Sequence, residues 1–397
     1  MKGYLGIFIL LCFNVTSSVA ISYLVSLKPS ETLDSFFKYD LTYPVGQQVK
    51  SLVGNSFSIG NFTGFTGNFP KAVVERLKRC PMVAEMTPDI VIKAFDIEVQ
   101  ENCPRHLARL SREDGLGDEL SYAYDSLAIG SDVNAYVLDS GVEIDHPEFE
   151  GRAHRGRDFT SEGPGDLNGH GTHVAGIIGS RTYGVAKNVD IIEIKALDKY
   201  GAGSLSTIIA GLEFAVNHRK SSGKAGVANL SLGAAKNSVL NRAVQAAVDT
   251  GLVVVVAAGN SNINACSSSP ASAPSAITVG AIDDATDSIA SFSNWGPCVD
   301  IMASGSYVSS VNAKNYNKPQ VLSGTSMSSP VVSGLIANLL SAGVSPFDVR
   351  ERVIELSAKD KISRTSLILR RKTPNRIAYN GIEYTPEYSD SDSDSDE

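Results

Sequence analysis

The central part of the chain alternates between short apolar runs and segments with the periodicity of amphipathic helices. The apolar runs, which predict strands buried on both faces, lie at 133–138, 191–197, 227–232 and 252–258. Helical patterns lie at 204–218 and 239–248, and a later helix is expected to begin with Ser345 as N-cap and Pro346 at the first position. Strands that alternate with helices predict an α/β domain whose mainly parallel sheet is covered on both faces.

A different pattern precedes this domain. Residues 21–100 predict a small α+β unit with strands at 21–27, 57–65 and 90–95, a helix-like run between the first two strands and a helix at 71–79.

The two ends of the chain differ from both folded parts. Lys2, an apolar run at 4–15 and small residues up to Ala20 indicate a secretory signal peptide at 1–20. That run is shorter than the roughly 20 residues that span a bilayer. No later run is long enough either, so we expect no transmembrane segment. Residues 373–397 lack apolar periodicity, and we expect an acidic disordered tail there.

Charge and composition narrow the class of protein. The chain has 397 residues, of which 43 are acidic and 35 basic, for a formal net charge of −8. Seven acidic residues and no basic residue lie from Glu383 onward, so the rest of the chain is nearly balanced. A hydrophobic share of 43% with 20% charged residues is typical of a globular protein. This composition excludes a disordered chain, a disulfide mini-protein and a basic nucleic-acid binder.

Three reactive residues lie at the ends of predicted elements, where α/β sheets form their sites. Asp139 follows the strand at 133–138, His170 lies between two glycines at a helix start, and Ser326 opens an apolar helical segment. A serine hydroxyl is a weak nucleophile unless a histidine takes its proton, and a carboxylate must then stabilise the imidazolium. Asn260, just past the strand at 252–258, could donate its amide to an oxyanion.

The segments around these four residues, in this order, resemble the subtilisin family of serine proteases, most closely its proteinase K branch. The match runs from about 102 to 340 and includes 107–111, 146–152, 181–186, 206–211 and 291–294. The resemblance implies a subtilisin-like three-layer fold for 101–372. It assigns Asp139 as orienting acid, His170 as general base, Ser326 as nucleophile and Asn260 as oxyanion donor.

The same resemblance implies partners and substrates. Residues 21–100 resemble the family's inhibitory propeptide, a ferredoxin-like unit that acts as intramolecular inhibitor and is removed by self-cleavage, here near 97–102. Protein or peptide substrates would lie between two strands at 201–203 and 231–233. The residues assigned to substrate binding are Gly201, Ala202, Gly203, Leu205, Ser231, Leu232, Gly233, Ala257, Ala258 and Gly259. Because pairing with the substrate backbone depends little on sequence, we expect broad specificity. The S1 pocket would be walled by 232–233 and 257–259, which carry no charge, so we expect a preference for an apolar or aromatic P1 residue.

Further features of the family apply to loops and cysteines. Pro274, Ala276 and Asp300 match positions that hold a structural Ca²⁺ in proteinase K-like enzymes, and the alternative is a capped loop without metal. Cys266 and Cys298 match a disulfide of aqualysin-like members. Cys80 and Cys103 remain, either as a transient link between propeptide and mature chain or as two free thiols. Asn61 begins a glycosylation sequon, whereas the sequon at Asn229 lies on the expected substrate strand and is discounted.

Together these patterns predict a self-activating serine endopeptidase that needs no cofactor for its chemistry. We expect a monomer that is secreted, free or associated with the cell wall or surface, or alternatively held in a vacuole-like lumen. The alternative function is a subtilisin-fold binding or structural protein that stays blocked by its propeptide.

Overall fold

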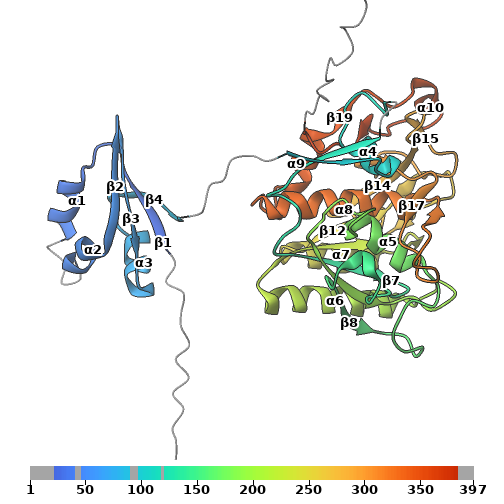
Figure 1. The fold of residues 1–397 in the computed structure, drawn as a ribbon, viewed down its shortest axis with the longest axis horizontal. Coiled ribbons are helices and arrows are strands. Elements are labelled where there is room, and N and C mark those ends of the chain that lie inside the picture. The colour runs from blue at the N-terminus through green and yellow to red at the C-terminus, as the bar shows by residue number, and fades with distance from the viewer. Residues whose placement is uncertain (1–21, 41–45, 90–96, 118–119, 383–397) are drawn as a thin grey trace, which may run out of the picture. The chain divides into compact units, whose positions relative to one another are not determined.

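The computed structural model describes residues 22–40, 46–89, 97–117 and 120–382, and the chain divides into two compact units between Ala94 and Phe95 (Figure 1). The predicted signal peptide, the predicted strand at 90–95 and the tail from Glu383 lie outside the described residues. Among the described helices, none is both long and apolar enough to cross a bilayer.

The first unit is a four-stranded antiparallel sheet in the order β2-β3-β1-β4. Its elements are β1 (Ser22–Leu27), α1 (Leu33–Asp40), α2 (Gly46–Leu52), β2 (Val53–Ile59), β3 (Phe62–Asn68), α3 (Lys71–Lys78) and β4 (Val83–Pro88). With α1 and α2 together joining β1 to β2, the order is the β-α-β-β-α-β of a ferredoxin-like unit, which the resemblance implied. Phe36, Phe65 and Leu77 are buried in its core.

Two strand predictions in this unit were wrong. The single strand expected at 57–65 is a hairpin, because Gly60 turns the chain at a φ of 58° between β2 and β3. In addition, no strand was predicted at 83–88, where β4 pairs with β1.

The second unit is built on a ten-stranded sheet in the order β19-β20-β16-β14-β12-β10-β7-β9-β8, with β15 paired to β14. These strands are β7 (Val133–Asp139), β8 (Ala153–Asp158), β9 (Asp190–Lys195), β10 (Ala225–Leu230), β12 (Val253–Ala257), β14 (Ile277–Asp283), β15 (Ser288–Ile289), β16 (Ile301–Ser304), β19 (Ala358–Lys359) and β20 (Arg376–Ile377). All neighbours from β20 to β8 are parallel, as the alternating pattern predicted.

Helices cover both faces of this sheet and make three layers (Figure 1). They are α4 (Arg105–Leu110), α5 (His170–Gly179), α6 (Leu205–Ser222), α7 (Ser238–Asp249), α8 (Thr325–Ser341), α9 (Val349–Leu356) and α10 (Arg364–Ile368). Val253 and Val255 of β12 pack in one core with α5 and α8, while Val254 and Val256 pack in another with α6 and α7. A strand that buries alternate residues on opposite faces needs a continuous apolar run, which explains the sequence pattern.

Small two-stranded sheets complete the second unit. They pair β5 (Ile97–Glu101) with β6 (Ser121–Asp125), β11 (Ala234–Ala235) with β13 (Ser268–Ser269), and β17 (Val308–Ser310) with β18 (Gln320–Leu322). Residues 97–100 were predicted to belong to the first unit. Because β5 pairs with β6, these residues belong to the second unit instead.

Two boundaries near the C-terminus also differ from the prediction. The tail was expected from residue 373, yet β20 joins the main sheet, Tyr379 is buried and the Asn380 N–H donates to the Leu110 carbonyl at 2.9 Å. The late helix α9 begins at Val349, although Ser345 caps the turn that leads into it: its hydroxyl accepts from the Phe347 N–H at 3.3 Å and its carbonyl from the Val349 N–H at 3.0 Å.

Candidate active site

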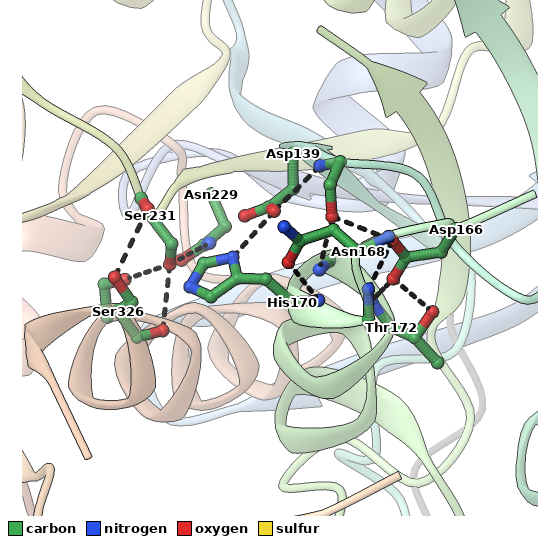
Figure 2. A network of polar contacts seen from close by, with 12 residues as sticks. Asp139, Asp166, Asn168, His170, Thr172, Asn229, Ser231 and Ser326 are labelled. Carbon is green, nitrogen blue, oxygen red and sulfur yellow. Dashed lines mark hydrogen bonds and ion pairs between the residues drawn. The ribbon is translucent and has the colours of Figure 1, made fainter. Parts of the chain in front are cut away.

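Asp139 and His170 form a short hydrogen-bonded pair at the carboxyl edge of the parallel sheet. Asp139 ends β7 and is fully buried. Its Oδ1 accepts from Nδ1 of His170 at 2.7 Å and from the Ser140 N–H at 2.8 Å. Since Nδ1 donates to the carboxylate, Nε2 keeps its lone pair, and the imidazole lies between Asp139 and Ser326 (Figure 2). The ring is therefore oriented to accept a proton on its Ser326 side.

The glycines on either side of His170 have different structural reasons. Gly169, the residue before α5, has a φ of 99°, which side chains rarely tolerate. Gly171 has an ordinary φ, but a Cβ there would lie 2.1 Å from the Gly141 carbonyl oxygen. The motif thus lets the start of α5 approach the end of β7 closely enough for His170 to reach Asp139.

A second buried carboxylate, Asp166, fixes the loop that leads into α5, and the sequence reasoning missed it. One oxygen accepts from the Ser140 hydroxyl at 2.9 Å and the Gly169 N–H at 2.8 Å. The other accepts from the Thr172 N–H at 2.8 Å and its hydroxyl at 2.7 Å (Figure 2). The available signal was a carboxylate just ahead of a helix start, where it stabilises unpaired N–H groups.

These carboxylates decide the protonation of His170. Burial by itself lowers the pKa of His170, but the Asp139 charge and hydrogen bond, with a contribution from Asp166, outweigh it and raise that pKa above its ordinary value. The imidazole is thereby a stronger base than an isolated histidine.

Ser326 is the second residue of α8, so its hydroxyl lies at the positive end of the helix dipole. Its Oγ donates to the Ser231 carbonyl at 3.3 Å. In return, the Ser231 hydroxyl donates to the Ser326 carbonyl at 2.9 Å and accepts from the Asn229 amide, also at 2.9 Å (Figure 2). The predicted substrate residue Ser231 thus also holds the backbone of the nucleophile segment.

Asn260 is oriented by a residue that the sequence reasoning did not single out. Its Oδ1 accepts from the Thr325 N–H at 2.8 Å and from the Thr325 hydroxyl at 2.9 Å. With Oδ1 occupied, the remaining polar group of the amide is the donor Nδ2, which is what an oxyanion requires. The Thr325 hydroxyl also accepts from the Gly259 N–H at 3.0 Å, and Thr325 is fully buried.

Two cavities flank the extended segment at 231–235, and together they hold every predicted substrate residue. The first, about 480 Å³, is lined by Asp139, His170, Gly201, Ala202, Gly203, Leu205, Ser231, Leu232 and Gly233 among others. The second, about 520 Å³, is lined by Ser231, Leu232, Gly233, Ala257, Ala258, Gly259, Asn260 and Ser326 among others. Residues 201–203 and 231–233 line the first cavity but lie outside the regular strands, so the strand assignment was wrong. Sequence reasoning missed Ile208, Leu240 and Ile263 in the linings.

Two of the four cysteines in the described residues are paired and two are free. Cys266 and Cys298 form a disulfide with their Cα atoms 5.3 Å apart, as predicted. Cys80 and Cys103 carry free thiols, and burial raises the pKa of Cys103 to about 12. Their pairing in a precursor stays a hypothesis.

Asn61 lies in the exposed turn between β2 and β3, whereas Asn229 is 1% exposed, consistent with discounting the second sequon.

The residues assigned to calcium do not offer a free ligand set. The Pro274 carbonyl and the Asp300 carboxylate both accept hydrogen bonds from Arg350. Two of the three groups that should coordinate the ion are therefore bound to a cationic side chain. We conclude that these residues do not fit a Ca²⁺ ion.

Comparison with known proteins identifies the family. Residues 130–377 match the Subtilase family, and the chain belongs to it. It is 42% identical to the subtilase-type proteinase RRT12 of Saccharomyces cerevisiae, over 94% of this chain and 85% of that protein. It is 41% identical to the subtilisin-like serine protease Rho m 2.0101 of Rhodotorula mucilaginosa, over 78% of this chain and 95% of that protein.

A solved structure supports the same family assignment. A crystal structure described as a cold adapted subtilisin-like serine proteinase matches with a TM-score of 0.64 and 38% identity, covering 71% of this chain and 100% of that one. The chain is thus a subtilisin-like serine protease with an α/β fold, as the sequence predicted.

Proposed function

We propose that the protein is an endopeptidase that cleaves peptide bonds through an acyl-enzyme at Ser326. His170 takes the Ser326 proton and delivers it to the leaving amine, and Asp139 orients and stabilises the imidazolium. The Asn260 amide and the Ser326 N–H, near the start of α8, stabilise the oxyanion. The observation that carries this proposal is the Asp139–His170 hydrogen bond of 2.7 Å, with the ring facing a serine at a helix N-terminus (Figure 2).

The chemistry of the two cavities supports a preference for apolar or aromatic P1 residues. Among the described residues, none with a charged side chain lines the cavity beside Ser326 and Ala257–Gly259. Leu205 and Leu232 line the cavity on the other side of the extended segment, where an apolar P4 residue would lie. A basic P1 side chain would find no carboxylate there, so we expect kcat/KM for a Phe substrate to exceed that for the matched Lys substrate.

The separate first unit supports a zymogen. Its ferredoxin-like order is that of the family's propeptide, and we propose that it is an intramolecular inhibitor removed by self-cleavage during secretion. A cut within Ile97–Glu101 would divide β5, which is paired with β6, so a cut ahead of this strand would leave the catalytic unit whole. N-terminal sequencing of the processed chain, with Ser326→Ala expected to stay unprocessed, locates the cut.

A fluorophosphonate probe tests the nucleophile directly. We expect labelling of the wild type and none of Ser326→Ala. Ser323→Ala is the matched control, because Ser323 lies in the same segment but its hydroxyl accepts from the Tyr307 N–H at 2.8 Å. That variant should be labelled like the wild type. An unlabelled, unprocessed wild-type chain would contradict the proposal and favour the blocked binding protein.

A further inference from the structure

A guanidinium group occupies the position where the family resemblance placed a calcium ion. Nη1 of Arg350 donates to the Pro274 carbonyl oxygen at 2.6 Å. Nη2 of the same side chain donates to Oδ1 of Asp300 at 2.5 Å. One side chain therefore bridges a carbonyl and a carboxylate that are far apart in sequence.

The acceptors of this bridge lie in a fixed part of the sheet. Oδ2 of Asp300 accepts from the Thr278 N–H at 2.8 Å, and the Asp300 N–H donates to the Thr278 carbonyl at 2.9 Å. Asp300 immediately precedes β16, and Thr278 lies at the start of the neighbouring strand β14. The Asp300 side chain is only 14% exposed, and each of its oxygens accepts a hydrogen bond within the protein.

The helix that supplies Arg350 is held in place by its own apolar residues. Val349 and Val353 lie one turn apart on α9 and are both buried in the core shared with α8. Their burial fixes the rotation of the helix and directs position 350 toward the loop at Pro274. Arg350 is thus supplied by a docked element.

We propose that Arg350 is a built-in cation that replaces the calcium ion at this site and ties α9 to the starts of β14 and β16. Guanidinium is always charged, and its planar set of donors suits a carboxylate and a carbonyl together. Calcium needs 6–8 oxygen ligands at about 2.3–2.6 Å, and here two of the candidate groups are bound to N–H donors. A second cation beside Arg350 would also be repelled. The stability of this region is therefore independent of calcium.

Thermal unfolding of the full-length chain carrying Ser326→Ala, which prevents self-digestion, tests this inference without relying on the proposed chemistry. We expect the same Tm in excess EDTA and in millimolar CaCl₂. Arg350→Met keeps the aliphatic part of the side chain but leaves Asp300 without its cation, and we expect Tm to fall by roughly 3–8 °C. The matched control is Arg352→Met on the same helix, whose guanidinium makes an exposed ion pair with Glu355 at 3.4 Å. That control should change Tm by less than about 1 °C.

A double-mutant comparison shows whether the partner is Asp300. If Arg350 acts through Asp300, then combining Arg350→Met with Asp300→Asn should lower Tm by less than the sum of the two single effects. Equal Tm values for Arg350→Met and Arg352→Met would overturn the inference. So would a calcium-dependent rise in Tm that disappears in Asp300→Asn, because calcium would then be bound at this carboxylate. A calcium-dependent rise in Tm that persists in Asp300→Asn comes from another site. In that case the inference is judged by whether Arg350→Met lowers Tm more than Arg352→Met does.

Discussion

The two sides of the active site are built from different kinds of polar group. Around His170, two buried carboxylates organise the site: Asp139 accepts from the ring and Asp166 holds the loop ahead of α5. Around Ser326, the organising groups are neutral. The Ser231 and Thr325 side chains hold the nucleophile segment and the Asn260 amide through hydroxyl and backbone hydrogen bonds.

This difference separates two tasks of a serine protease. Carboxylates change the pKa of a neighbouring base, so the His170 side controls when a proton can be taken. Neutral dipoles leave that pKa nearly unchanged but can be fixed where charge develops, so the Ser326 side controls how well the oxyanion is stabilised. Changes on the first side should alter the pH dependence of the rate, and changes on the second should lower it at every pH.

The largest effect among these changes is expected from Asp139→Asn. The substitution keeps the shape of the side chain but removes the charge that stabilises the imidazolium and selects the Nδ1–H tautomer. We expect kcat to fall on the order of 10⁴-fold, the loss known for the same change in another serine protease. The measurement is kcat on a peptide substrate, with the Tm confirming that the variant is folded. A loss below about 100-fold would mean that Asp139 does not orient the base.

Asn260→Leu should have the next largest effect. It removes the oxyanion donor without touching the base, so we expect kcat to fall about 10²–10³-fold, as in subtilisin, with little change in KM. The acid limb of the pH profile should stay where it is in the wild type. A variant that raised KM and kept kcat would instead place Asn260 in ground-state binding.

Sequence patterns predicted Asp139 and His170 on the carboxylate side of the site, but not Asp166. A continuous apolar strand with an aspartate at its end fixes where Asp139 emerges, and the glycines around His170 record the close approach of α5 to β7. The parallel sheet itself follows from strands that are apolar on both faces.

Other features depend on contacts between distant segments, which no local pattern records. β4 has only partly buried apolar positions and becomes a strand by pairing with β1. Arg350 reads as an ordinary surface arginine until the fold brings it to Pro274, 76 positions away. Thr325 lies within the nucleophile motif, but only the folded structure shows that it orients Asn260.

Thr325→Val should sharpen the comparison with a smaller effect. Valine keeps the volume but removes the hydroxyl that donates to Asn260 and accepts from Gly259, so the oxyanion donor is less well fixed. One hydrogen bond contributes about 0.5–1.5 kcal/mol, so kcat should fall about 2- to 12-fold, equally at all pH values. Thr325→Ser restores the hydroxyl and should recover most of the loss. Equal rates for the two variants would show that the hydroxyl is not used.

The smallest effect is a displacement of the pH profile. Only the neutral imidazole accepts a proton, so kcat/KM falls as the pH drops through the pKa of His170. Because that pKa is raised from its ordinary value of 6.5, the acid midpoint of the kcat/KM profile should lie above pH 6.5.

Asp166→Asn removes one of the charges that raise the pKa of His170, so the acid limb should move to lower pH. The control is Thr325→Val, which changes only the neutral side and should leave the limb unmoved. If the limb moved in Thr325→Val, or stayed in place in a folded Asp166→Asn variant, the division between a side that sets protonation and a side that sets geometry would be wrong. The paired profiles thus test the division itself, independently of how much rate either variant loses.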